Sequence, residues 1–135
     1  MKFDDRTIVP DMRSFRAHPS ALFEIRQFVR EHAAAASLPE QMTNDLLLAV
    51  SEAAANSIIH TTTAAIQLSW ARDGECVEIE VRDTGIFKKR VRIAEVEGRG
   101  GHGIPLMMAL VDRLTIEEGT QRRPGTLVRL VKCRT

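Results

Sequence analysis

The sequence predicts an α+β fold, a two-layer sandwich in which helices cover one face of a mostly antiparallel mixed sheet. Apolar residues recur at helical spacing through two segments of the first 60 residues. Two stretches of strict apolar–polar alternation follow, joined by an Asp-Gly turn. A glycine-rich loop, a short apolar helix and a second pair of strands complete the chain.

Length and composition indicate one domain over residues 1–135, with a core at about 14–131 and residues 1–12 as a tail or edge strand. The net charge of +1, from 19 basic and 18 acidic side chains, argues against direct nucleic-acid binding. No apolar run approaches the roughly 20 residues of a membrane helix, and no signal-peptide core begins the chain. We therefore expect a cytoplasmic protein without membrane contact. Cys76 and Cys133 are too few for a disulfide framework or a zinc site, so both thiols are expected to be reduced.

The first half of the chain predicts an edge strand and two helices. Residues 13–17 fit an edge strand, and Pro19 opens a helix that ends near residue 37. A second helix begins after Pro39 and should extend to about residue 60. Apolar residues lie on most of its sides, so we expect it to be largely buried. The three threonines at 61–63 are poor helix formers and should end it.

The second half predicts two hairpins. Residues 65–70 and 77–82 alternate in polarity on either side of a turn that contains Asp73 and Gly74. The remaining elements are a short helix and a closing hairpin around Pro124-Gly125, at residues 104–111, 114–118 and 126–132. We expect Met107 and Met108 to fill the core. His18 and His32 carry no visible role.

A row of polar side chains follows one face of the long second helix. Glu52, Asn56 and His60 are spaced four residues apart, so all three lie on that face. Polar groups on a mostly buried helix are costly unless they find partners. Such a row fits either a functional site or a solvated stripe with ordinary hydrogen bonds.

Asp83 ends the second predicted strand in phase with its inward apolar residues. Its carboxylate should therefore enter the apolar layer, where it requires a hydrogen-bond donor such as the exocyclic amine of a bound base. Gly85 would let the backbone turn close to a ligand. The alternative is a simple strand-ending turn, in which Asp and Gly are common.

Four glycines occur among residues 98–103, directly before the short helix. Free N–H groups and a positive dipole end at a helix N-terminus suit phosphate. The loop lacks the Gly-Lys-Ser/Thr of a Walker A motif, and no strand leads directly into it, as a Rossmann loop requires. A flexible hinge is the alternative interpretation.

Taken in order, these motifs resemble the Bergerat ATP-binding fold of gyrase, heat-shock chaperones, mismatch-repair ATPases and histidine kinases. The segment SEAAANSIIH at 51–60 looks like the asparagine box of bacterial anti-sigma-factor serine/threonine kinases. The segment GTLVRL at 125–130 looks like the end of that family's domain. The resemblance covers about residues 14–131, which is nearly the whole chain.

The resemblance implies ATP and Mg²⁺ as cofactors and a role for each matching residue. Asn56 would coordinate Mg²⁺, and Glu52 would act as the general base. Asp83 would accept a hydrogen bond from the adenine amino group, with Gly85 and Thr126 beside it. Residues 87–103 would form the ATP lid, in which the nucleotide-binding residues would be Arg99, Gly100, Gly101, His102 and Gly103.

The resemblance also implies partners. The protein would sequester a sigma factor and phosphorylate a serine or threonine on a STAS-type anti-anti-sigma antagonist, and it would form a homodimer through its N-terminal strand and first helix. One residue departs from the pattern: Phe87 stands where the family's first glycine box has its second Gly. This departure favours the alternative, a nucleotide-gated binding protein with little or no kinase activity.

Overall fold

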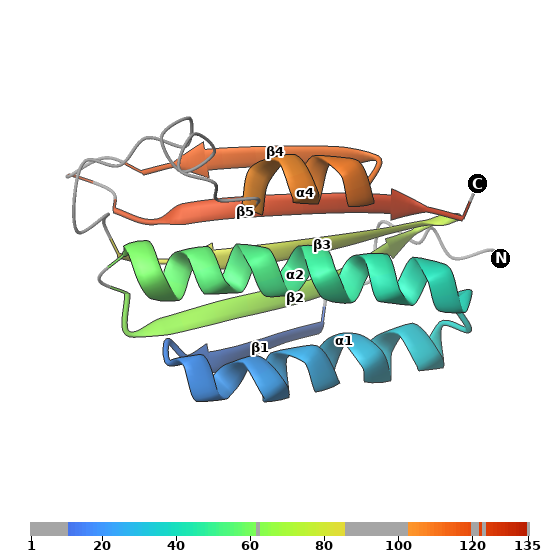
Figure 1. Ribbon diagram of the computed structural model, residues 1–135, viewed down its shortest axis with the longest axis horizontal. Helices are drawn as coiled ribbons and strands as arrows, with labels where there is room; N and C mark the ends of the chain where they lie inside the picture. The colour runs from blue at the N-terminus through green and yellow to red at the C-terminus, as the bar shows by residue number, and fades with distance from the viewer. Residues whose placement is uncertain (1–10, 62, 86–102, 120–121, 123, 135) are drawn as a thin grey trace, which may run out of the picture.

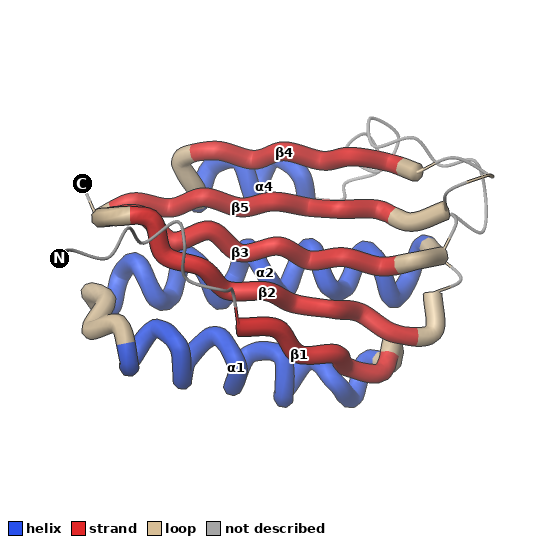
Figure 2. Tube along the Cα trace, turned by 180° about the vertical axis from the view of Figure 1, so that it is seen from behind, coloured by secondary structure: helices blue, strands red, loops and turns tan. Residues whose placement is uncertain are grey.

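The computed structural model describes residues 11–61, 63–85, 103–119, 122 and 124–134. It confirms the predicted two-layer α+β architecture. Within this described part, three α-helices lie against one face of a five-stranded sheet (Figures 1 and 2). The elements are β1 (Asp11–Arg16), the 3-10 turn η2 (Pro19–Ala21), α1 (Leu22–Ala35), α2 (Glu40–His60), β2 (Ala65–Asp73), β3 (Cys76–Asp83), α4 (Gly103–Leu110), β4 (Arg113–Glu118) and β5 (Thr126–Cys133).

The sheet has the strand order β1-β2-β3-β5-β4. All four pairings are antiparallel, so the expected mixed sheet is wrong for the described strands. The order is not sequential because β5 inserts between β3 and β4. The first and last rungs of the β3–β5 pair are Cys76↔Cys133 and Asp83↔Thr126. The two predicted hairpins are therefore joined edge to edge.

Local sequence explains where the elements begin and end. Pro39 precedes the first residue of α2, and the extended Thr61 ends the helix, as predicted. The β2–β3 turn is tighter than expected, because Asp73 pairs directly with Cys76. Gly74 supplies the positive φ of 64° that such a two-residue turn requires. The region of residues 1–10 lies outside the described residues.

The core lies between the helices and the inward face of the sheet. Phe28, Leu46, Ile79 and Leu130 have no exposed surface. The alternation of β3 is confirmed, because Val77, Ile79, Val81 and Asp83 are all buried. Met107 is buried as predicted, whereas Met108 is 62% exposed and does not fill the core. A helix of this length turns only one stripe toward its neighbours, so adjacent methionines face different ways.

Both histidines of the first segment have structural roles that the sequence did not reveal. The ring of His18 accepts a hydrogen bond from the Ser20 amide and caps η2. His32 stacks between Phe28 and Trp70 and bonds Asp11 of β1 at 2.5 Å. It thereby ties the edge strand to α1.

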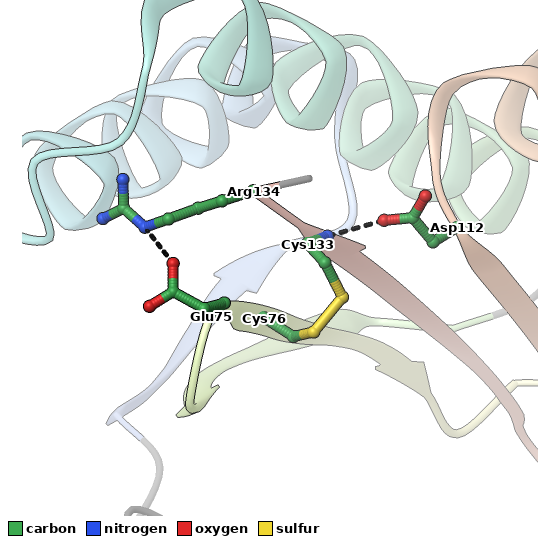
Figure 3. Close-up of a disulfide and its surroundings, with 5 residues drawn as sticks. All are labelled: Glu75, Cys76, Asp112, Cys133 and Arg134. Carbon is green, nitrogen blue, oxygen red and sulfur yellow. Dashed lines mark hydrogen bonds and ion pairs between the residues drawn. A yellow bond between two sulfur atoms is a disulfide. The ribbon is translucent and has the colours of Figure 1, made fainter.

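Cys76 and Cys133 form a disulfide, so the expectation of two reduced thiols is wrong (Figure 3). Both are strand residues, and the insertion of β5 beside β3 places them directly opposite each other. Their sequence separation of 57 residues gave no sign of this proximity. None of the helices in the described ranges is long and apolar enough to cross a membrane.

We expect the two phenylalanines of α1 to differ sharply in their contribution to stability. Phe28 is fully buried and meets Phe15 edge to face, with ring centroids 6.0 Å apart, whereas Phe23 is 65% exposed. Phe28→Ala should lower the free energy of unfolding by about 3–5 kcal/mol, because it leaves a cavity. The matched control, Phe23→Ala, should change it by less than about 0.5 kcal/mol. Urea titration of both variants tests this, and equal costs would contradict the packing described here.

Candidate functional site

The predicted site residues of α2, β3 and β5 converge at one end of the sheet. Asp83 ends β3 and Thr126 begins β5, so the two form the last rung of that ladder. The C-terminal half of α2, which carries Glu52 and Asn56, lies over the same end (Figure 1). Gly103 begins α4, which packs against α2. Segments far apart in the sequence thus surround one region.

Asp83 is the centre of a hydrogen-bond cluster. Its side chain is only 3% exposed, which confirms that it enters the apolar layer. The Ser57 hydroxyl donates to Oδ2 at 2.6 Å, and the amides of Gly85 and Thr126 donate to Oδ1 at 3.1 and 3.3 Å. A carboxylate can accept about four hydrogen bonds. Three donors within the described part of the chain leave room for one more, such as an amino group.

Burial raises the pKa of Asp83 above its ordinary value of 3.8, and this outweighs the opposing effect of the three donors. Removal from water disfavours the charged form, whereas the Ser57 hydroxyl and the two amides favour it. A buried carboxylate with a shifted pKa beside a strand end is typical of a functional site, although structural clusters also shift pKa values.

Ser57 is a site residue that our sequence analysis did not single out. It is 5% exposed and lies on α2 next to Asn56. A signal was present, since Ser57 is a polar residue in the helical row of Ala49, Ala53 and Ala54, which are all buried. Its partner could not be read from the sequence, because Ser57 and Asp83 are 26 residues apart.

The threonines after α2 extend this cluster. The Thr61 hydroxyl donates to the Ser57 carbonyl at 2.6 Å, and the Thr63 amide donates to the Thr61 hydroxyl at 3.2 Å. The Thr84 amide in turn donates to the Thr63 hydroxyl at 3.3 Å. These bonds fix the end of β3 to the end of α2, so the threonines hold the site together besides ending the helix.

Gly125 is required by the close approach of β5 to β3. Its φ of 128° is unfavourable for any residue with a side chain. A Cβ at this position would lie 2.5 Å from the backbone oxygen of Asp83. The glycine therefore allows the Thr126 amide to reach the carboxylate.

Glu52 and Asn56 are half-buried on α2. Neither side chain makes a hydrogen bond to another residue in the described ranges of the chain. They differ in this from Ser57, one position further along the helix. Half-buried polar groups that no described residue engages are suited to binding a ligand.

The end of the sheet is hollowed beside Asp83. A cavity of about 290 Å³ is lined there by Asp83, Thr84, Gly125 and Thr126, together with Glu117 and Glu118 of β4. Arg82 also lines the cavity, and its guanidinium partly offsets the negative charge of the two glutamates. The positive dipole end at the N-terminus of α4 would attract the phosphates of an anionic ligand.

Several predicted residues cannot be placed. Arg99, Gly100, Gly101 and His102, together with Phe87 and the rest of the expected lid before Gly103, lie outside the described residues. His60 ends α2, but its side chain is likewise outside. In the described ranges, no group of three or more His, Cys, Asp or Glu side chains could hold a metal ion.

Residues 15–132 match the family described as histidine kinase-like ATPase domain. The chain belongs to this family. The match, together with the sheet and helices above, confirms the Bergerat fold that the motifs indicated, and this fold implies an ATP site. No curated protein sequence matches the chain.

Solved structures support this family assignment at the level of the fold. One crystal structure contains the RsbU and RsbW domains of Rv1364c from Mycobacterium tuberculosis. It matches with a TM-score of 0.72 at 21% identity, over 93% of this chain. The match covers 32% of the chain in that structure, so the protein described here spans about a third of the length of that chain.

We expect a side chain at Gly125 to disturb the site end of the β3–β5 pair. Gly125→Ala combines positive-φ strain with a backbone clash, so it should lower the free energy of unfolding by about 3 kcal/mol. The matched control is Gly74→Ala in the β2–β3 turn, where an added Cβ meets no atom within 4 Å. That change should cost only about 1 kcal/mol of conformational strain. Denaturant titration compares the free energies of unfolding of the two variants. A smaller loss for Gly125→Ala than for Gly74→Ala would contradict the close approach of β5 to β3.

The raised pKa of Asp83 predicts a pH-dependent difference between the wild type and Asp83→Asn. Below 3.8, the ordinary value, the carboxyl is protonated in both the folded and the unfolded chain. Above it, the unfolded chain loses the proton first, so the free energy of unfolding falls as pH rises through the raised pKa. The wild type should therefore lose stability relative to the Asn variant over a pH range that begins near the ordinary value of 3.8 and extends upward through the raised pKa. A difference that stays constant in urea titrations across this range would contradict the prediction.

Proposed function

We propose that this chain is an ATP-dependent anti-sigma factor that holds a sigma factor inactive and phosphorylates a serine or threonine on a STAS-type antagonist. The observation that carries the proposal is the contact between α2 and the end of β3. Ser57 donates to Asp83 at 2.6 Å; Asn56 adjoins Ser57 on α2, and Glu52 lies one turn before Asn56. The residue proposed to bind the adenine base and the residues proposed to act on the phosphates therefore belong to two elements in direct contact.

The residues present fit ATP. Asp83 retains an acceptor position for an adenine amino group, and the hollow beside it can take part of a base. The phosphates would extend toward α2, where Asn56 offers an amide oxygen. Mg²⁺ takes few protein ligands and keeps water and phosphate oxygens, so a single Asn is a sufficient protein contribution. The bound ion would offset negative charge on the phosphates.

Each residue then has a defined task. Asp83 would select the adenine base, and the Gly85 and Thr126 amides would keep the Asp83 carboxylate in place. Glu52 would accept the proton of the attacking hydroxyl, one helical turn from Asn56. Phosphoryl transfer depends mainly on position and charge, so a carboxylate, an amide and a lid can suffice.

The second candidate is a nucleotide-gated binding protein with little or no transfer, favoured by Phe87 in place of the usual second glycine. Both candidates keep the sigma-factor and STAS partners and a homodimer through β1 and α1. They differ in the fate of the γ-phosphate. In both, partner binding should depend on nucleotide.

Glu52→Gln tests the proposed base. The variant should lose phosphate transfer to the STAS partner by about 10²–10⁴-fold, because an amide cannot accept the proton. Its affinity for ATP, measured by calorimetry with and without Mg²⁺, should stay close to that of the wild type. Glu40→Gln, in the first turn of the same helix, is the matched control and should transfer normally.

Other outcomes separate the candidates. Wild-type protein that binds ATP and its partners but transfers no phosphate would establish the second candidate. Absence of ATP binding at millimolar nucleotide would overturn both.

A further inference from the structure

The Cys76–Cys133 disulfide occupies the end of the β3–β5 ladder opposite the nucleotide site. It joins the first residue of β3 to the last residue of β5, whereas Asp83 and Thr126 form the other terminal rung. The two rungs are seven residues apart along β3, or about 24 Å at ~3.4 Å per residue. The sulfurs are thus far from the proposed chemistry, and the site does not require them.

The disulfide links elements that are separate in the sequence. The chain between Cys76 and Cys133 contains β3, α4, β4 and β5, and with them every predicted site residue except Glu52 and Asn56. A disulfide that closes so long a segment restricts the conformations of this segment when it unfolds. The bond therefore affects how readily these strands separate.

Arg134 and Cys133 make several contacts beside the disulfide, and Figure 3 shows those with Glu75 and Asp112. The Arg134 amide donates to the Glu75 carbonyl at 3.1 Å, and its guanidinium lies 3.4 Å from the Glu75 carboxylate. The same guanidinium donates to the carbonyls of Ala36 and Ser37, between α1 and α2. The Cys133 amide donates to Asp112 at 2.6 Å. We call this set of contacts the Arg134 clamp.

The cysteines lie where a thiol reagent can reach them. Both are only partly buried. Cys76 alternates with the buried Val77, so its side chain lies on the face of the sheet opposite the helices. Partly exposed disulfides exchange with thiols more readily than buried ones do.

We propose that Cys76 and Cys133 are a reversible redox modification site that opens and closes the Arg134 clamp. In reduction, the thiolate of a small thiol such as glutathione attacks one sulfur, and the S–S bond breaks to leave a mixed disulfide and one protein thiol. A second reductant thiol then releases oxidised glutathione and the other protein thiol. The protein gains two electrons and two protons, and glutathione disulfide drives the reverse reaction.

The compartment supports reversibility. A disulfide in a cytosolic protein is usually transient and redox-sensing. The expectation of a cytoplasmic location rests on the proposed function, because a sigma-factor regulator would act in the bacterial cytoplasm. The geometry of the clamp stands without it.

Glutathione titration of the full chain, read by thiol alkylation and mass spectrometry, tests the proposal. The native protein should pass from no alkylated thiols to two as reduced glutathione replaces oxidised glutathione. Hydrogen exchange of the Arg134 and Cys133 amides should become at least about tenfold faster on reduction, because local opening then costs less. The Thr126 amide, at the site end of the same strand, should change by less than about twofold.

The Cys76→Ser/Cys133→Ser variant is the control, and oxidant should leave its exchange rates unchanged. Should this variant fail to fold, alkylation of the wild type still decides the question. Free thiols under oxidising conditions, or a bond that glutathione does not reduce in the native protein, would overturn the proposal. Equal exchange at Arg134 in both redox states would overturn it as well. None of these results depends on ATP or partner binding, so failure of the proposed function is detected separately.

Discussion

The site depends on a buried carboxylate whose hydrogen bonds come from three separate elements. Asp83 receives donors from α2, from the turn after β3 and from the start of β5. Asp83 is only 3% exposed, so without these donors its carboxylate would be strongly unfavourable. These donors fix the position of the carboxylate between α2, the turn after β3 and the start of β5.

The same constraint explains several small residues around the site. Ser57 is short enough to lie between α2 and the sheet while donating its hydroxyl proton. Gly125 lets two strands approach where a Cβ would meet the Asp83 carbonyl. The threonines that follow α2 convert the end of a helix into a hydrogen-bonded link to β3. Each residue supports the position of the carboxylate that is proposed to select the base.

The two ends of the β3–β5 ladder have different chemistry. One end carries the polar cluster and the hollow, and the other carries a covalent bond and the Arg134 clamp. Opening of one terminal pair has little effect on distant pairs of the same two strands, because each ladder hydrogen bond joins only adjacent residues. This separation lets the clamp respond to redox conditions while the site end of the same two strands stays paired.

Apolar periodicity and the residues that end helices and strands by themselves determined the elements and the inward direction of Asp83. The motifs from Glu52 to Thr126 indicated the ATPase family. These features follow from local chemistry, since the helical and strand repeats fix which side chains share a face. Only the tertiary structure decided the partners: Ser57 for Asp83, Cys133 for Cys76, and the carbonyls of Ala36 and Ser37 for Arg134. All three depend on through-space packing and strand order, above all on the insertion of β5 between β3 and β4. Alternation along a strand reveals its faces, but it does not say which strand lies beside it.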